Sequence, residues 1–112
     1  MTIQFEIYCG LDANGHDDVD PIETVFALAL KYFPDGHSIR EETGRWAIRD
    51  HYGPTSQIVT ERTLVVTWLC TDVQAQNGSA RNLVGKFALD YKDMCYQQSV
   101  MVSELEPEVT FY

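Results

Sequence analysis

Basic residues are scarce in this sequence. Its 112 residues include 8 Lys and Arg against 17 Asp and Glu, which gives a formal net charge of −9. Nucleic-acid binding depends on neutralising phosphates with basic side chains, and adsorption to anionic membranes needs the same sign of charge. The composition therefore disfavours direct binding to DNA, RNA or a membrane, and it favours a partner with a basic surface. Acidity also keeps a small protein soluble without any partner, so this second explanation stays open.

Long apolar runs and paired cysteines are missing as well. No run approaches the roughly 20 apolar residues that span a bilayer, and the first residues lack the basic and apolar regions of a secretion signal. The three cysteines, Cys9, Cys70 and Cys95, are odd in number and far apart. This spacing is typical of buried thiols in a reducing cytoplasm rather than of a disulfide framework. We expect one cytoplasmic domain, residues 1–112, that folds without disulfides.

Motifs for common cofactors and metals do not occur. The sequence has no phosphate-cradling glycine loop, no paired-cysteine metal site and no histidine-rich helix. The acidic loop with Asp12, Asn14 and Asp17 does not match an EF-hand, which needs alternating ligands and a glutamate at the twelfth position. His37 and His51 fall in predicted turns without a neighbouring nucleophile. We therefore predict no cofactor, no metal site and no catalytic triad.

Strand and helix patterns alternate along the first third of the chain. Residues 3–9 alternate between apolar and polar side chains, which predicts a half-buried strand. Asp20 can accept the free amide hydrogen of Glu23, and Pro21 needs no partner for its missing N–H, so a helix begins there. It ends near Phe33, before a proline. Its predicted apolar stripe is Ile22, Val25, Phe26, Ala29 and Phe33.

The rest of the chain predicts two strands, a helix and a last strand. Residues 38–48 form a polar edge strand in which Gly44 marks a bulge or bend. Residues 58–70 form the next strand, and within it residues 64–69 are apolar on both faces, as in a central strand. A helix runs from Asn77 or Ser79 to about Cys95, and residues 99–102 open the last strand. The apolar face of this helix is predicted to be Leu83, Val84, Phe87, Ala88, Tyr91 and Met94.

This order of elements predicts the fold class. Two strand–helix–strand units give an α+β, ferredoxin-like βαββαβ two-layer sandwich, with an antiparallel sheet and two helices on one face. Right-handed crossovers place the first and third strands at the centre of the sheet and the second and fourth at its edges.

Four short motifs resemble a family of small bacterial proteins of unknown function. Members of that family read tyrosine–x–glycine, phenylalanine–proline–x–glycine, glycine–x–tryptophan and glutamine–glutamate–serine–valine in this order. Here the motifs are Tyr8-Cys9-Gly10, Phe33-Pro34-Asp35-Gly36, Gly44-Arg45-Trp46 and Gln97-Gln98-Ser99-Val100. Gln98 stands where the family usually has an acid. The resemblance supports the fold and supplies no mechanism.

The sheet face that the helices leave uncovered is the best place for a small-molecule site. Tyr8, Trp46 and Glu61, with Glu6 nearby, are expected on or beside it, joined by Arg62 and Gln97. A glutamate in such a pocket can serve as a general base. The opposing explanation is that Glu61 and Arg62 are solvated strand residues and that Trp46 packs in the core or at the edge.

Two hypotheses of function follow. The first is a small acidic protein-binding module without catalytic activity that occupies a basic surface of a protein or nucleoprotein complex. A phage or mobile-element inhibitor of a nucleic-acid-handling complex, such as an anti-CRISPR protein, has this character, with carboxylates standing in for phosphates as in a DNA mimic. The alternative is a small homodimeric enzyme or ligand-binding protein that uses the open sheet face through Glu61, Tyr8 and Trp46. The predicted partner-binding residues of the first hypothesis are Asp12, Asp17, Asp18, Asp20, Glu41 and Glu42.

Overall fold

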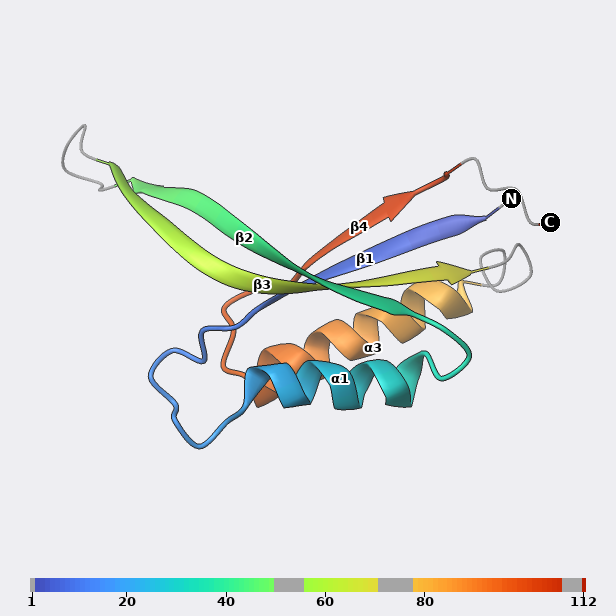
Figure 1. The fold of residues 1–112 in the computed structure, drawn as a ribbon, viewed down its shortest axis with the longest axis horizontal. Helices are drawn as coiled ribbons and strands as arrows, with labels where there is room; N and C mark the ends of the chain where they lie inside the picture. Colours follow the sequence, from blue (N-terminus) through green and yellow to red (C-terminus); the bar gives the residue numbers. More distant parts are fainter. Residues whose placement is uncertain (1, 50–55, 71–77, 108–111) are drawn as a thin grey trace.

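A computed structural model describes residues 2–49, 56–70, 78–107 and 112, with only the backbone for residues 45–49 and 56–59. The chain runs strand, helix, strand, strand, helix, strand (Figure 1). This order confirms the predicted ferredoxin-like βαββαβ sandwich. The elements are β1 (Ile3–Gly10), α1 (Pro21–Tyr32), β2 (Ser38–Arg49), β3 (Ser56–Cys70), α3 (Ser79–Met94) and β4 (Met101–Leu105).

The sheet has the strand order β2-β3-β1-β4, and every pair of neighbours is antiparallel. The apolar strands β1 and β3 therefore lie at the centre, as predicted. The pairing of β2 with β3 runs without interruption from Ser38 opposite Thr67 to Arg49 opposite Ser56. Of the bulge or bend predicted at Gly44, the bulge is therefore wrong. Gly44 instead lies opposite Glu61 in a regular ladder.

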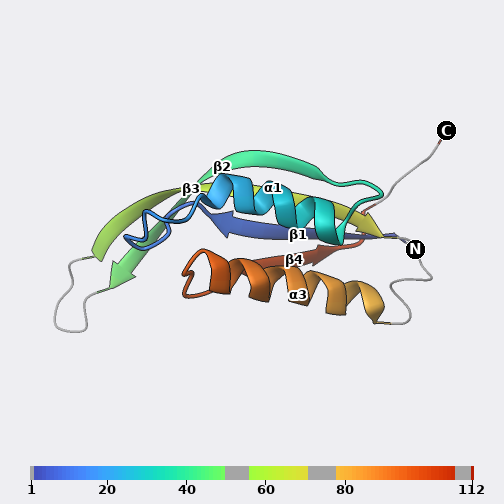
Figure 2. The ribbon, with the colours of Figure 1, turned by 90° about the horizontal axis from the view of Figure 1, so that it is seen from below.

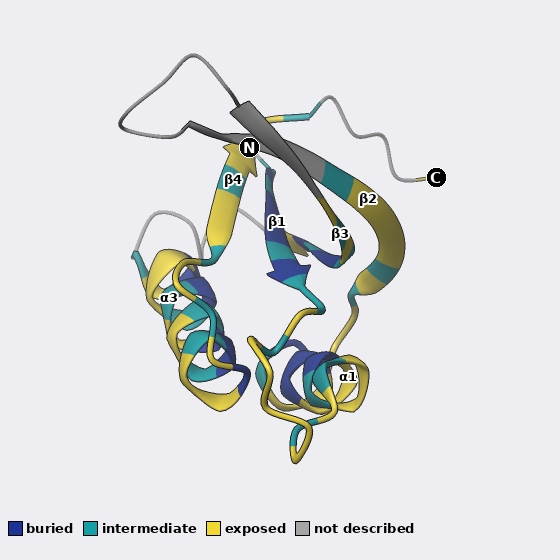
Figure 3. Ribbon diagram, turned by 90° about the vertical axis from the view of Figure 1, so that its left-hand side faces the viewer, coloured by how far each residue is buried: buried dark blue, intermediate teal, exposed yellow. Residues whose placement is uncertain are grey.

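Both helices lie side by side on the same side of the sheet (Figures 1 and 2). Their buried faces turn toward β1 and β3, whereas β4 is largely exposed (Figure 3). A stack of aromatic rings joins the two layers: the centroid of Phe33 lies 4.6 Å from that of Trp68 and 5.6 Å from that of Phe87. The stack thus joins the end of α1, helix α3 and the central strand β3.

Helix α1 begins as predicted, because the Asp20 side chain accepts the Glu23 amide hydrogen at 3.2 Å. Its core stripe is only partly as predicted. Val25 and Ala29 are buried, but Ile22 and Phe26 are 40% and 53% exposed, and Leu28 is buried instead. The segment is apolar almost all round, so helical spacing alone allows several faces, and packing on the sheet selects this one.

Helix α3 shows a similar, smaller correction. Val84, Phe87 and Tyr91 are buried as predicted, whereas Met94, in the last turn, is 51% exposed. Within the described ranges, no helix has the length and apolar character needed to cross a membrane.

The cysteines are confirmed as buried free thiols. Burial raises the pKa of Cys9 to about 12, because the thiolate would lose its solvation. A thiol with so high a pKa is a poor nucleophile at neutral pH. Cys9 and the other two cysteines therefore contribute to packing.

Candidate functional site

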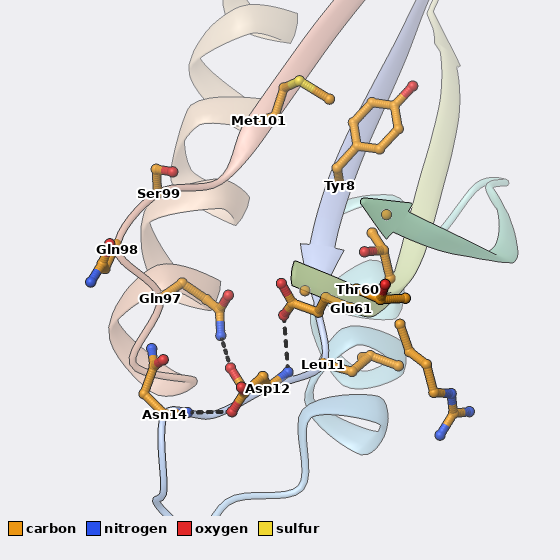
Figure 4. Close-up of a pocket in the computed structure, with 14 residues that line it drawn as sticks. Tyr8, Leu11, Asp12, Asn14, Thr60, Glu61, Gln97, Gln98, Ser99 and Met101 are labelled. Carbon is orange, nitrogen blue, oxygen red and sulfur yellow. Dashed lines mark hydrogen bonds between the residues drawn. The ribbon is translucent and has the colours of Figure 1, made fainter. Parts of the chain in front are cut away.

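A cavity of about 1010 Å³ opens at the end of β1, where the chain leaves the sheet (Figure 4). Its walls come from β1, the loop after it, the first half of β3 and the segment that joins α3 to β4. Its volume is at the upper end of the range usual for small-molecule sites. Residues that line it include Tyr8, Gly10, Leu11, Asp12, Asn14, Thr60, Glu61, Gln97, Ser99 and Met101.

The carboxylate of Glu61 lies over the last residue of β1. The backbone N–H of Asp12 donates a hydrogen bond of 3.1 Å to Glu61 Oε1. This position depends on Gly10, because a Cβ there would lie only 2.3 Å from the same oxygen. A residue without a side chain, Gly10, is therefore needed where the Glu61 carboxylate packs against the backbone of β1. Glu61 Oε2 accepts no hydrogen bond from the described residues.

Gln97 holds the loop that contains Asp12. Its Nε2 donates to the carbonyl oxygens of Asp12, at 2.6 Å, and Cys95, at 3.0 Å. Asp12 thus donates to Glu61 with its N–H and accepts from Gln97 with its C=O, as the dashed lines in Figure 4 show. Asp12 therefore connects Gln97, which follows α3, to the carboxylate of Glu61.

A second set of contacts closes the same loop onto the end of α3. The Asn14 side chain donates to the backbone oxygen of Tyr96, and the rings of His16 and Tyr96 stack with centroids 3.5 Å apart. Asn14 and Tyr96 both have positive φ, 54° and 55°, which only a minority of non-glycine residues adopt. The loop is held from two sides, so the floor of the cavity is fixed by tertiary contacts.

Tyr91 anchors the strand end from within the core. Its fully buried side chain donates a hydrogen bond to the Gly10 carbonyl oxygen. Burial raises the pKa of Tyr91 well above its ordinary value, because the phenolate would be desolvated. The hydroxyl therefore remains a hydrogen-bond donor.

Three of the residues predicted for a small-molecule site meet at this cavity: Tyr8, Glu61 and Gln97. Arg62 also borders it, but its Nε pairs with Glu41 at 2.6 Å. Trp46 has a described backbone, paired with Val59, and its side chain lies outside the described residues.

Glu6 takes part in a separate network on the helix-free face of the sheet. Its carboxylate accepts hydrogen bonds from the Tyr8 hydroxyl, at 2.6 Å, and from two nitrogens of Arg40, both at 3.3 Å. The Tyr8 hydroxyl and then Arg40 hold the pKa of Glu6 below its usual value. The same contact raises the pKa of Tyr8. Glu6 is 8% exposed and its charge is compensated, so its role is to fix Tyr8 and Arg40.

The six acids predicted to bind a basic partner have different surroundings. The Asp12 carboxylate accepts the Asn14 N–H at 2.9 Å, and Asp20 caps α1. Glu41 pairs with Arg62, and Glu42 pairs with Arg40. Asp17 and Asp18 are exposed on the loop before α1, and no described residue forms an ion pair with them.

Sequence reasoning does not single out Gly10 or Tyr91 as site residues. Gly10 carries one usable signal, since it ends an alternating strand, where close approach of another group favours glycine. Tyr91 carries none, because its helical spacing predicts a core residue and the contact with Gly10 joins residues far apart in the chain.

No family model matches the chain, and no curated protein sequence does. Solved structures are similar to it in fold. A phage SAM lyase in complex with S-methyl-5'-thioadenosine matches with a TM-score of 0.63 at 14% identity, over 94% of this chain and 81% of that one. The phage SAM lyase in its apo state gives 0.56 at 18%, over 92% and 78%. GlnK of B. subtilis with ATP gives 0.52 at 12%, over 94% and 83%.

Proposed function

We propose that this chain is a lyase for an S-adenosyl sulfonium compound, with the cavity at Glu61 as its active site. The observation that carries the proposal is the acidic cavity itself, in which Glu61 leaves one carboxylate oxygen without a partner among the described residues. The likeness in fold to a SAM lyase supports the choice of substrate class, because it extends over nearly the whole chain. We place the activity in the cytoplasm.

The charge of the cavity supports a cationic substrate. Glu61 and Asp12 both line it, and the guanidinium of Arg62, the basic residue among the described lining residues, is paired with Glu41. A sulfonium carries a positive charge next to the bond that breaks. A fixed carboxylate in a partly enclosed site attracts such a group more strongly than it would in water.

The reaction needs little from the protein. When the carbon–sulfur bond to the amino-acid arm breaks, its electron pair stays on sulfur, and the sulfonium becomes a neutral thioether, S-methyl-5'-thioadenosine. As that bond breaks, a carboxylate oxygen of the arm itself bonds to the carbon that sulfur leaves, so the four-carbon fragment departs as a lactone and no water is consumed. The role of Glu61, Asp12 and Gln97 is then to bind and orient the arm for departure, since held geometry alone contributes much of an enzymatic rate.

Conversion of S-adenosylmethionine by the purified protein tests this proposal. We expect S-methyl-5'-thioadenosine to accumulate in a chromatographic assay, and we expect Glu61→Gln to lower the rate by at least about 100-fold, as loss of an electrostatic contact commonly does. Glu106→Gln is the matched control, because Glu106 is exposed and lies away from the cavity. Absence of product from the folded wild-type protein would refute the proposal.

A docking role is the second candidate. It is favoured by the net charge of −9 and by the exposed carboxylates of Asp17 and Asp18, which form no ion pair with the described residues. In this role the chain inhibits a nucleic-acid-handling complex by covering a basic surface. Dimerisation through the helix-free sheet face belongs to the enzyme proposal instead.

Charge reversal tests the docking role. Asp17→Lys with Asp18→Lys is expected to reduce capture of a basic partner from host lysate about tenfold at low salt, since complementary charge mainly accelerates association. The control is Asp93→Lys, on the exposed side of α3. Equal capture by both variants at low salt would count against docking through this loop.

A further inference from the structure

Two hydrogen-bond acceptors converge at the floor of the cavity, and none of the described residues donates to both. Glu61 Oε1 and Gln97 Oε1 both approach the space above Gly10: a Cβ on Gly10 would lie 2.3 Å from the first oxygen and 3.0 Å from the second. Figure 4 shows the two side chains pointing toward each other from opposite walls. Two oxygens that converge in this way repel each other unless a donor lies between them.

The orientation of the Gln97 amide is fixed by its contacts. Its nitrogen and oxygen are hard to distinguish by shape, but one end contacts two carbonyl oxygens, those of Asp12 and Cys95. Carbonyl oxygens only accept hydrogen bonds, so the end that contacts them is the NH₂ group. The Oε1 atom is therefore the end that faces Glu61, and it has no donor among the described residues.

Among the described residues around the cavity, neither the Arg62 cation nor the Tyr8 hydroxyl is free to bind the oxygens of Glu61 and Gln97. The Tyr8 hydroxyl donates to Glu6, and Arg62 is held by Glu41. The backbone N–H of Asp12 reaches only Glu61 Oε1. A carboxylate and an amide oxygen thus remain available on one spot, and a group with several N–H bonds and a positive charge satisfies both.

From this geometry we propose that Glu61 and Gln97 form a subsite for a primary ammonium group of the ligand, with Gly10 providing the space. An ammonium nitrogen carries three donors and makes hydrogen bonds of about 2.7–2.9 Å to carboxylate oxygens. The inference rests on the proposed function, and it identifies the group that the cavity recognises: the amine of the amino-acid arm, in preference to the sulfonium. Asp12 acts as a positioning residue for this subsite, because its N–H holds the Glu61 carboxylate.

A pair of thioethers, both with an uncharged sulfur, tests the contribution of the amine. S-methyl-5'-thioadenosine and S-adenosyl-3-thiopropylamine share the nucleoside and the uncharged sulfur, and only the second ends in a primary ammonium group. In calorimetric titrations we expect the amine to bind wild-type protein at least about tenfold more tightly, the scale of one charge-assisted hydrogen bond. In Glu61→Gln the preference should fall below about threefold, while Glu106→Gln retains it.

Gln97→Leu provides a second variant, since it removes the amide oxygen. It is expected to weaken binding of the amine several-fold, with Asn82→Leu as its control, because Asn82 is an exposed amide of α3 that does not line the cavity. Equal affinity for both thioethers in the wild type would overturn the ammonium subsite and leave the nucleoside site intact. A preference that persists in Glu61→Gln would also overturn it. Binding of neither compound would refute the subsite together with the proposed function.

Discussion

Gly10→Ala is expected to weaken ligand binding about 100-fold with little loss of folded protein. The new methyl group would lie 2.3 Å from Glu61 Oε1 and 2.8 Å from its carboxyl carbon, both side-chain atoms, so the carboxylate must move away. A displacement of about 1 Å at a reacting or binding group can cost about 100-fold. We therefore expect affinity for the amine-bearing thioether, and turnover of the sulfonium, to fall by about that factor.

Gly85→Ala is the matched control for this substitution. Gly85 lies inside α3, and a Cβ there meets no atom within 4 Å. Alanine is favoured over glycine in a helix by up to about 1 kcal/mol, so this variant should be equally or more stable and should bind normally. Both variants are measured by urea denaturation and by titration. Normal binding by Gly10→Ala would show that the position of Glu61 does not determine recognition.

Phe87→Ala should have the largest effect on stability. Phe87 is fully buried in α3, and its ring lies against two residues of the end of α1, Tyr32 and Phe33, at centroid distances of 6.0 Å and 5.6 Å. Truncation leaves a cavity between the two helices and the sheet, and buried phenylalanine to alanine changes cost about 3–5 kcal/mol. That is a large part of the roughly 5–15 kcal/mol by which a domain is stable.

Leu89→Ala serves as the comparison in the same helix. Leu89 is 61% exposed, so its truncation should change the free energy of unfolding by less than about 0.5 kcal/mol. Urea denaturation followed by circular dichroism measures both variants. A small effect of Phe87→Ala would mean that the helices are not held together by this aromatic contact.

The fold could be predicted from the sequence because its signals are local. The cap at Asp20 and the alternation of β1 each depend on neighbours within a few residues, and both predictions are confirmed. The predicted strand order is confirmed too, since the polarity of β2 and the apolar character of β3 indicate edge and centre. The face of α1 was harder, because Ile22 and Phe26 are apolar without being buried.

The site could be predicted only in part. Tyr8 and Glu61 were expected on or beside the open sheet face, joined by Gln97, and all three do line one cavity. The contacts that give the site its character join Asp12 to Glu61 and Asp12 to Gln97, across 49 and 85 residues of sequence. Loop conformation and helix position decide these contacts, and neither leaves a periodic pattern.

The far half of the β2–β3 hairpin extends beyond both helices (Figure 1). There the two strands pair only with each other, and no helix covers them. The other half of β3 pairs with β1 as well, and its Trp68 packs in the aromatic stack. An isolated two-stranded ribbon is only marginally stable in water. A single strand therefore spans two cooperative units, so that the outer arm can fray and re-form while the buried end, with Trp68, remains closed.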